Sequence, residues 1–211
     1  KTMNKDVYDK SFILQKDEYN KYKNFIKQHF KIILPKEEGG NWSLKGILNL
    51  AAQSVYRHGI KIVVIDPWNE IEHQRPAGMN EVDYISYALT EIRRFARKYK
   101  VHVYIVAHPK VMVKDRDGKY PVPTPYDVSG GAHWRNKADN ILTVYRNVGL
   151  IDEDITDIHI QKIRFRENGR VGVYSIRTHR ITHAFVDDID QEKRANAIRS
   201  STPVSSKELL L

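Results

Sequence analysis

The segment IKIVVIDPWNE, residues 60–70, is the strongest indication of the fold class, because a strongly apolar strand pattern ends in it at Asp66. Five of its first six residues are β-branched and apolar, without the polar alternation of a half-buried strand. This pattern predicts a strand buried on both faces, as in a parallel sheet. Asp66 then either starts a turn with Pro67 or is an acid held at the carboxyl edge of the sheet, where α/β folds bind ligands.

Apolar spacing on both sides of this strand predicts an alternation of helices and strands. Residues 43–58 have apolar residues at helical spacing, with Ser43 as an N-cap and Gly59 as the C-terminal stop. Residues 80–99 show a second helical pattern, and VHVYIVAH at 101–108 predicts another buried strand. The order strand, helix, strand predicts a parallel α/β sheet with right-handed crossovers.

Additional elements are predicted outside this centre. Residues 17–29 predict a helix, and KIIL at 31–34 predicts a short strand. After a long basic region rich in Gly and Pro, three more segments have strand patterns, and Asn168-Gly169 between the last two predicts a hairpin. These segments are residues 141–146, 157–165 and 170–177. We therefore expect an antiparallel edge appended to the parallel sheet.

The chain divides by pattern into three parts. Residues 1–30 are an N-terminal helical segment, residues 31–184 hold the α/β region, and residues 185–211 form a polar tail without periodicity. With 211 residues and 41% apolar content, the chain is long enough for one well-packed domain and a tail. Its first residue is Lys rather than Met, so we expect a fragment or a processed product.

Composition narrows the class of partner and the compartment. The chain has no cysteine, which excludes a disulfide framework and a thiolate metal site. No apolar run approaches a membrane span and nothing at the start resembles a signal peptide, so we expect a cytoplasmic protein without a membrane partner. The net charge of +9 favours a polyanionic partner, with nucleic acid as the first candidate.

Two strand ends carry side chains that suit nucleotide chemistry. Asp66 could hold magnesium, directly or through water, beside nucleotide phosphates, although an isolated Asp-Pro is more simply a turn. His108 ends the next predicted strand and would reach the same crevice, where its ring could hydrogen-bond a terminal phosphate. A single His at a strand end is more often structural, and Lys110 after it has the alternative interpretation of a solvated charge.

The segment SGGAHWRNKAD, residues 129–139, has the composition of a loop that binds single-stranded nucleic acid. Its glycines would present backbone N–H groups, while Arg135 and Lys137 supply charge and His133 and Trp134 supply flat faces. An ordinary surface loop whose tryptophan packs inward is an equally good interpretation of the composition.

Lys162 and Arg164 form a basic pair two residues apart on a predicted strand, so their side chains share one face. Such a pair could reach the phosphates bound to a neighbouring subunit, as an arginine finger does. A solvated basic face is the simpler interpretation of the pair in isolation.

Taken in order, these motifs resemble a DnaB-type replicative helicase, most of all the branch of phage primase-helicases and Twinkle. The order is an Asp-ending strand, a His-ending strand, a D-x-S-G-G-A-x-x-R-N-K-A-D segment and a K-x-R hairpin. The resemblance covers residues 30–177 and rests on IDPWNEIEHQRP, AHPKVM, YDVSGGAHWRNKADN and QKIRFRENGRVG. It implies a RecA-like, mostly parallel sheet flanked by helices, with an antiparallel C-terminal hairpin edge.

The resemblance also implies a role for each matched residue. Asp66 matches the Walker B aspartate that organises magnesium, and His108 matches the residue that senses the γ-phosphate of ATP. Lys162 and Arg164 match the pair that reaches across the subunit interface, which completes the expected catalytic and nucleotide-binding set. The expected DNA-contacting residues are Lys110, Arg135 and Asn136, with Lys137 beside them.

The sequence departs from this family at one required motif. No G-x-x-x-x-G-K-[ST] phosphate-binding loop occurs in the chain, nor the strand-end Glu that serves as general base. We expect both to lie upstream, so this chain alone should hydrolyse ATP slowly or not at all. Without the P-loop strand, the strand that ends at His108 should also keep an unpaired edge and an exposed apolar flank.

The leading hypothesis is therefore part of the ATP-dependent motor of a hexameric helicase that moves on single-stranded DNA and unwinds duplex. ATP and magnesium would be its cofactors. Its partners would be single-stranded DNA, further copies of itself in a ring, and primase or other replication proteins, in the cytoplasm of a bacterial or phage-infected cell. The alternatives are a nucleotide-independent module that binds single-stranded DNA or docks on a helicase, and a recombinase-like ATPase that forms open filaments.

Overall fold

A computed structural model of the chain describes residues 16–34, 42–116, 118–146, 154–178 and 184–187. The chain divides into two compact units. The first unit contains residues 1–108 and 128–137, and the second contains residues 109–127 and 138–211. The boundaries expected from sequence pattern, at residues 30 and 184, stay predictions.

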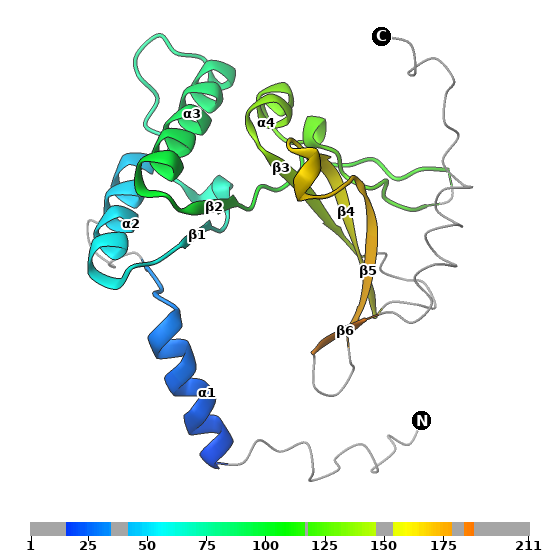
Figure 1. Cartoon of the computed structure of the whole chain (residues 1–211). Coiled ribbons are helices and arrows are strands. Elements are labelled where there is room, and N and C mark those ends of the chain that lie inside the picture. The colour runs from blue at the N-terminus through cyan, green and yellow to red at the C-terminus, as the bar shows by residue number, and fades with distance from the viewer. Residues whose placement is uncertain (1–15, 35–41, 117, 147–153, 179–183, 188–211) are drawn as a thin grey trace, which may run out of the picture. The chain divides into compact units, whose positions relative to one another are not determined.

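The first unit contains a two-stranded parallel sheet, β1–β2, with helices α2 and α3 beside it (Figure 1). Its elements are α2 (Leu44–His58), β1 (Ile62–Ile65), the short 3-10 helix η3 (Trp68–Glu70), α3 (Glu81–Tyr99), β2 (His102–Ile105) and α4 (Gly131–Lys137). The two strands pair in register from Ile62 with His102 to Ile65 with Ile105. The predicted strand–helix–strand unit is confirmed.

The predicted ends of α2 and α3 are confirmed by their caps. The Ser43 hydroxyl accepts a hydrogen bond from the backbone N–H of Gly46 at 3.2 Å, and Gly59 stops α2 at φ 64°. The side chain of Asn80 accepts from the backbone N–H of Asp83 in the same way at the start of α3. These side-chain oxygens satisfy amide groups that have no partner within the helix.

The expectation that β1 is buried on both faces is wrong for the described residues. Val63 and Ile65 lie in the core with α2 and α3, whereas Ile62 is 57% exposed and Val64 60% exposed. The reason is that the described residues place helices against only one face of this sheet. Tyr104 and Val106 also have exposed side chains, as expected for the strand that ends at His108.

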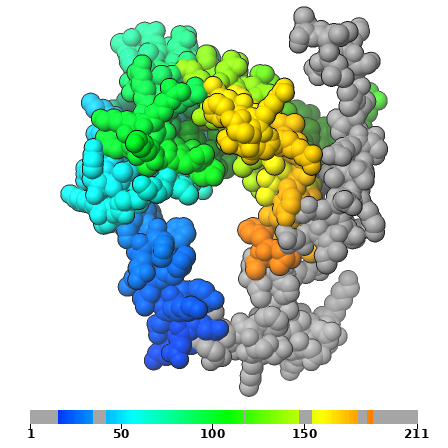
Figure 2. Space-filling view, viewed as in Figure 1, coloured from blue at the N-terminus to red at the C-terminus, as the bar shows by residue number. Residues whose placement is uncertain are grey.

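The N-terminal helix is α1 (Lys16–His29), as predicted, and every one of its residues is exposed (blue in Figure 2). The predicted strand at residues 31–34 does not form: these residues have no regular structure, and Ile32 and Leu34 are exposed. A β-strand needs a neighbour for its backbone groups, and the described residues provide none here. Across the described ranges, no helix is long and apolar enough to cross a membrane.

The second unit is built on an antiparallel sheet in the order β3–β4–β5–β6 (Figure 1). The strands are β3 (Asn140–Tyr145), β4 (Ile155–Ile163), β5 (Gly172–Thr178) and β6 (Phe185–Asp187). They form a sheet of their own in the described residues, whereas the sequence predicted an edge appended to the parallel sheet.

The hairpin predicted in this sheet forms between β4 and β5, but its connection is longer than a two-residue Asn-Gly turn. The connection contains the 3-10 helix η5 (Arg166–Asn168), and Gly169 follows at φ 139°. Strand β6 lies within the segment expected to be a polar tail, because Phe185 and Val186 pair with β5. Residues 188–211 of that tail lie outside the described residues.

Candidate functional site

Asp66 and His108 lie at the same edge of the parallel sheet, as the sequence predicts. Asp66 directly follows β1, and His108 comes three residues after β2, whose last residue is paired with the last residue of β1. Beyond the strands, Val106 donates its N–H to the Ile65 carbonyl at 2.9 Å. Both candidate side chains are exposed, so they are open to a ligand at the carboxyl edge where α/β sheets bind nucleotides.

The residues at this edge fit magnesium held together with a nucleotide rather than a metal held by protein alone. In the described part of the chain, no group of three or more acidic or histidine side chains could hold a metal ion. Magnesium sites often use one or two carboxylates, with phosphate oxygens and waters as the other ligands. The single exposed carboxylate of Asp66 is compatible with that arrangement. Pro67 is the N-cap residue of the 3-10 helix η3, so the interpretation of Asp-Pro as the start of a turn is confirmed, while the metal-binding role of Asp66 stays a prediction.

The segment predicted to be a flexible loop is instead a short helix, α4 (Gly131–Lys137). Trp134 is 8% exposed, and its Nε1–H donates to the Ser129 carbonyl at 2.8 Å. The interpretation of this tryptophan as a stacking face for bases is therefore wrong, and the alternative that it packs inward is confirmed. Burial of the large apolar ring is favourable, and the hydrogen bond to the Ser129 carbonyl satisfies its single donor.

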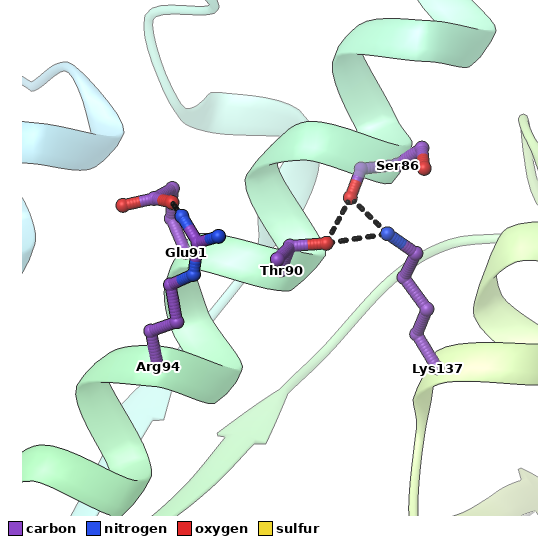
Figure 3. A network of polar contacts seen from close by, with 5 residues as sticks. All are labelled: Ser86, Thr90, Glu91, Arg94 and Lys137. Carbon is purple, nitrogen blue, oxygen red and sulfur yellow. Dashed lines mark hydrogen bonds and ion pairs between the residues drawn. The ribbon is translucent and has the colours of Figure 1, made fainter.

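Helix α4 is also fixed to α3 by polar contacts (Figure 3). The Lys137 ammonium donates to the Ser86 carbonyl at 2.7 Å and to the Thr90 hydroxyl, which itself donates to Ser86. Two residues before α4, the Ser129 hydroxyl donates to a Glu81 carboxylate oxygen at 2.5 Å. Lys137, proposed from sequence as a DNA contact, thus has its ammonium against α3.

The other expected DNA-contacting residues differ in exposure. Lys110 and Asn136 are exposed, and Arg135 is partly buried. Lys110 belongs to the second unit, where its backbone N–H donates to the Asp127 carbonyl at 2.7 Å, while the other two belong to α4 in the first unit. Their proposed contact with DNA stays a prediction.

Lys162 and Arg164 converge on the two residues that follow α4. The Lys162 ammonium donates to the Ala138 carbonyl at 2.8 Å, and the Arg164 Nη2 donates to the same oxygen at 3.4 Å. The Arg164 Nε forms an ion pair with the Asp139 Oδ1 at 2.7 Å. In addition, the Arg164 backbone N–H donates to the Asp139 carbonyl at 2.9 Å. Asp139 therefore fixes the position of Arg164, a role that sequence analysis did not assign to it.

Sequence analysis also did not predict a cluster of aromatic rings that includes Trp68, two residues after Asp66. Trp68 contacts Trp134 and His73, and the His73 ring contacts Tyr84, whose hydroxyl lies 3.4 Å from the His73 Nδ1. Burial lowers the pKa of His73 and raises the pKa of Tyr84, so both groups are neutral near pH 7. No local pattern predicts this cluster, because Tyr84 and Trp134 lie far along the sequence from Trp68.

Comparison with known proteins agrees with these features. None of the known protein-family models matches the chain. Over 149 residues it is 38% identical to the Twinkle homolog protein, chloroplastic/mitochondrial, of Arabidopsis thaliana. That alignment covers 69% of this chain but 20% of the plant protein, so the chain spans about a fifth of its relative's length.

Solved structures show the same fold. The ATPase domain of G40P superposes with a TM-score of 0.56 at 22% identity, covering 69% of this chain and 51% of that one. A DnaB-like replicative helicase, solved in a study of its interactions with primase, superposes with a TM-score of 0.57 at 23% identity. The match covers 68% of this chain and 35% of the helicase chain.

The chain thus has the α/β fold of RecA-like ATPase domains. The similarity to the Twinkle homolog, together with this fold, supports part of a DnaB-type RecA-like domain in the chain.

Proposed function

We propose that this chain is part of the ATP-dependent motor of a hexameric replicative DNA helicase, which moves on single-stranded DNA and unwinds duplex. The observation that carries the proposal is that Asp66 and His108 both follow strands at the same carboxyl edge of the β1–β2 sheet. The similarity to the Twinkle homolog protein and the basic charge of the chain support it.

ATP would bind at this edge. Magnesium would neutralise phosphate charge there when bound, and Asp66 is the residue placed to hold it. His108 would hydrogen-bond the terminal phosphate through its exposed ring and so distinguish ATP from ADP. Lys162 and Arg164, positioned by residues 138–139, would act on the nucleotide of the neighbouring subunit.

Lys110, Arg135 and Asn136 would each contact the DNA, the first two through their positive charge and Asn136 through its amide. Lysine and arginine side chains attract the phosphate backbone without regard to base sequence, as a motor that moves along DNA requires. Primase is a further proposed partner, since a DnaB-like neighbour was studied with primase.

The chain by itself is proposed to be inactive as an ATPase. Its sequence contains no P-loop motif, and backbone N–H groups of that loop supply most contacts to the phosphates. The intact helicase would supply the P-loop and the general base from residues outside these 211. Its compartment stays a prediction.

The proposed function is tested by Arg164→Ala in the intact helicase. We expect ATP turnover to fall by about 10³-fold or more, as for a lost arginine finger, with nucleotide binding nearly unchanged. Arg170→Ala is the matched control, because Arg170 is an exposed arginine in the same β4–β5 connection. Normal turnover in the Arg164 variant would refute the assignment of the pair.

A second candidate function is a nucleotide-independent module that binds single-stranded DNA, favoured by the absent P-loop motif and the net charge of +9. It predicts salt-dependent DNA binding by this chain that ATP does not change. Binding of a fluorescent ATP analogue with magnesium to the intact protein, compared with its Asp66→Asn variant, separates the two. Binding that the substitution weakens supports the motor, and no binding of the analogue supports the nucleotide-independent module.

A further inference from the structure

Two buried tryptophans meet between the strand ends and α4. The rings of Trp68 and Trp134 lie edge to face, with their centroids 5.3 Å apart and an interplanar angle of 88°. Trp68 is 6% exposed and Trp134 8% exposed, so the contact lies in the core of the first unit. Rings in this geometry attract one another, and dense packing around them transmits displacement.

Trp68 is tied to both strand ends of the candidate nucleotide site. It follows Asp66 by two residues and begins the 3-10 helix η3. Its backbone N–H donates to the carbonyl of Val106 at 2.7 Å, and Val106 lies two residues before His108. A shift of either strand end therefore moves the indole of Trp68.

Trp134 is tied to the candidate DNA-contacting residues. Arg135 and Asn136 follow it directly on α4, and its Nε1–H donates to the Ser129 carbonyl at 2.8 Å. Before α4, Gly130 is packed so closely that a Cβ there would lie 2.9 Å from the Ile85 side chain. Because Trp134 is buried and the residue before α4 is packed against Ile85, a displacement of Trp134 would be passed on to the residues that follow it on α4.

We propose that the Trp68–Trp134 contact couples nucleotide binding at the strand ends to DNA binding by α4. Both tryptophans are positioning residues, because neither lies among the groups proposed to touch ATP or DNA. The inference rests on the proposed function, since it needs nucleotide at Asp66 and His108 and DNA at α4. It adds the path by which one site acts on the other.

The coupling is measurable as a thermodynamic cycle in the intact helicase. The dissociation constant of a fluorescein-labelled oligo-dT is measured with and without a non-hydrolysable ATP analogue and magnesium. The ratio of the two constants is the coupling factor, typically about 5 to 150 in coupled proteins. By linkage, oligo-dT must change the affinity for the analogue by the same factor, which provides an internal check.

Trp68→Leu and Trp134→Leu should each bring the coupling factor close to 1. The affinities for oligo-dT alone and for the analogue alone should stay within about threefold, because neither tryptophan touches a ligand. The double variant should lose no more coupling than either single variant, since all three lack the same contact. A coupling factor that both single variants retain would overturn the inference.

Phe95→Leu is the control for a general loss of packing. Phe95 is buried in the same core and its ring packs against Tyr99, away from the Trp68–Trp134 contact. This variant should keep the wild-type coupling factor at a similar loss of stability. If it loses coupling as the tryptophan variants do, the effect is one of stability and the inference fails.

Conservative variants cover the case in which the leucine variants do not fold. Trp134→Phe keeps a ring against Trp68 but lacks the Nε1–H that binds Ser129, so we expect a reduced but measurable coupling factor. When Trp42 and every tryptophan outside this chain are replaced by phenylalanine in the intact helicase, Trp68 and Trp134 are the tryptophans that remain, and the analogue should change their emission without DNA. An unchanged emission would argue against the inference.

The same experiment separates the inference from the proposed function. If the wild-type helicase binds oligo-dT equally with and without the analogue, the proposed motor function fails, and the inference with it. If the wild type shows coupling and the tryptophan variants show it equally, only the inference fails.

Discussion

At the scale of single residues, Gly130 shows how a glycine fixes the entry to a helix. Its backbone has φ +72°, a region that side chains disfavour, and an added Cβ would lie 2.9 Å from the Ile85 Cδ1. Ile85 is buried, so it has little room to move away. Both the backbone conformation and the space therefore require glycine at this position.

We predict that Gly130→Ala destabilises the first unit more than Gly78→Ala does. Both changes place alanine in a left-handed conformation, which costs about 1–2 kcal/mol, but only Gly130 also has a side chain in the way. Gly78 has φ +82° and no atom within 4 Å of an added Cβ. Urea unfolding followed by tryptophan fluorescence measures the difference, since all three tryptophans lie in the first unit. Equal effects of the two variants would contradict the packing argument.

His159 makes the second unit sensitive to pH. Burial lowers its pKa, although nearby Asp157 opposes this in part, and the Nε2 of the ring is buried without a hydrogen-bond partner among the described residues. The folded state therefore favours the neutral ring, while the unfolded chain takes up a proton near pH 6.5. Stability contributed by the neutral ring is present above about pH 6.5 and is lost as the pH falls below it.

We predict that His159→Gln reduces the fall in melting temperature between pH 7.5 and pH 5.5. The measurement is thermal unfolding by circular dichroism at the two pH values, for the wild type and the variant. His102→Gln is the control, because His102 is exposed on β2. The prediction fails if the wild type and the His159 variant lose the same amount of stability on acidification.

At the scale of elements, α4 depends on its contacts with α3 more than on its own sequence. It has seven residues and starts with glycine, so it is too short and too poor in helix formers to be stable alone. Burial of Trp134 and the hydrogen bonds of Lys137 supply what its sequence does not.

We predict that Lys137→Ala destabilises the first unit by about 1–3 kcal/mol, because it leaves the Ser86 carbonyl without its charged donor. Lys45→Ala on the exposed side of α2 is the matched control and should have almost no effect. Urea unfolding of both variants by tryptophan fluorescence measures this. An unchanged stability together with weaker binding of single-stranded DNA would instead support the role first predicted for Lys137.

At the level of the whole molecule, the described residues of the first unit cover one face of the β1–β2 sheet and leave the other open. Val63 lies in the core, whereas its neighbour Val64 is 60% exposed. A RecA-like sheet flanked by helices on both faces would bury both residues. The open face thus agrees with the proposal that the intact helicase supplies the remaining part of the domain.

We predict that Val64→Asp leaves the stability of this chain nearly unchanged but prevents folding of the intact helicase. A carboxylate is well solvated on the open face and would be buried without a partner once that face is covered. Val63→Asp is the control and should unfold both forms, since Val63 is already buried. Soluble yield and thermal unfolding of the two forms measure this. An intact helicase that tolerates Val64→Asp would show that the face stays open.

Local sequence was enough to predict the helices α1, α2 and α3, the paired strands β1 and β2, and the order of the motifs, but neither the absence of a strand at residues 31–34 nor helix α4. Ser43 and Gly59 bound α2 as predicted, and the strands that end near Asp66 and His108 pair in parallel. These features depend on neighbouring residues: the spacing of apolar side chains, the hydrogen bond of a capping side chain and the conformational freedom of glycine. The order of the motifs then predicted a resemblance to DnaB-type helicases, which the similarity to the Twinkle homolog supports.

Which faces are covered, and which cationic side chains have partners, became visible only in the folded chain. Lys137 meets Ser86 across 51 positions of sequence, and Arg164 meets Ala138 across 26. The same positive charges could equally have faced solvent or DNA, because a local pattern does not specify a distant carbonyl or carboxylate. Tertiary packing brings these groups together. A helix as short as α4 is stable only because Trp134 is buried and Lys137 hydrogen-bonds to α3.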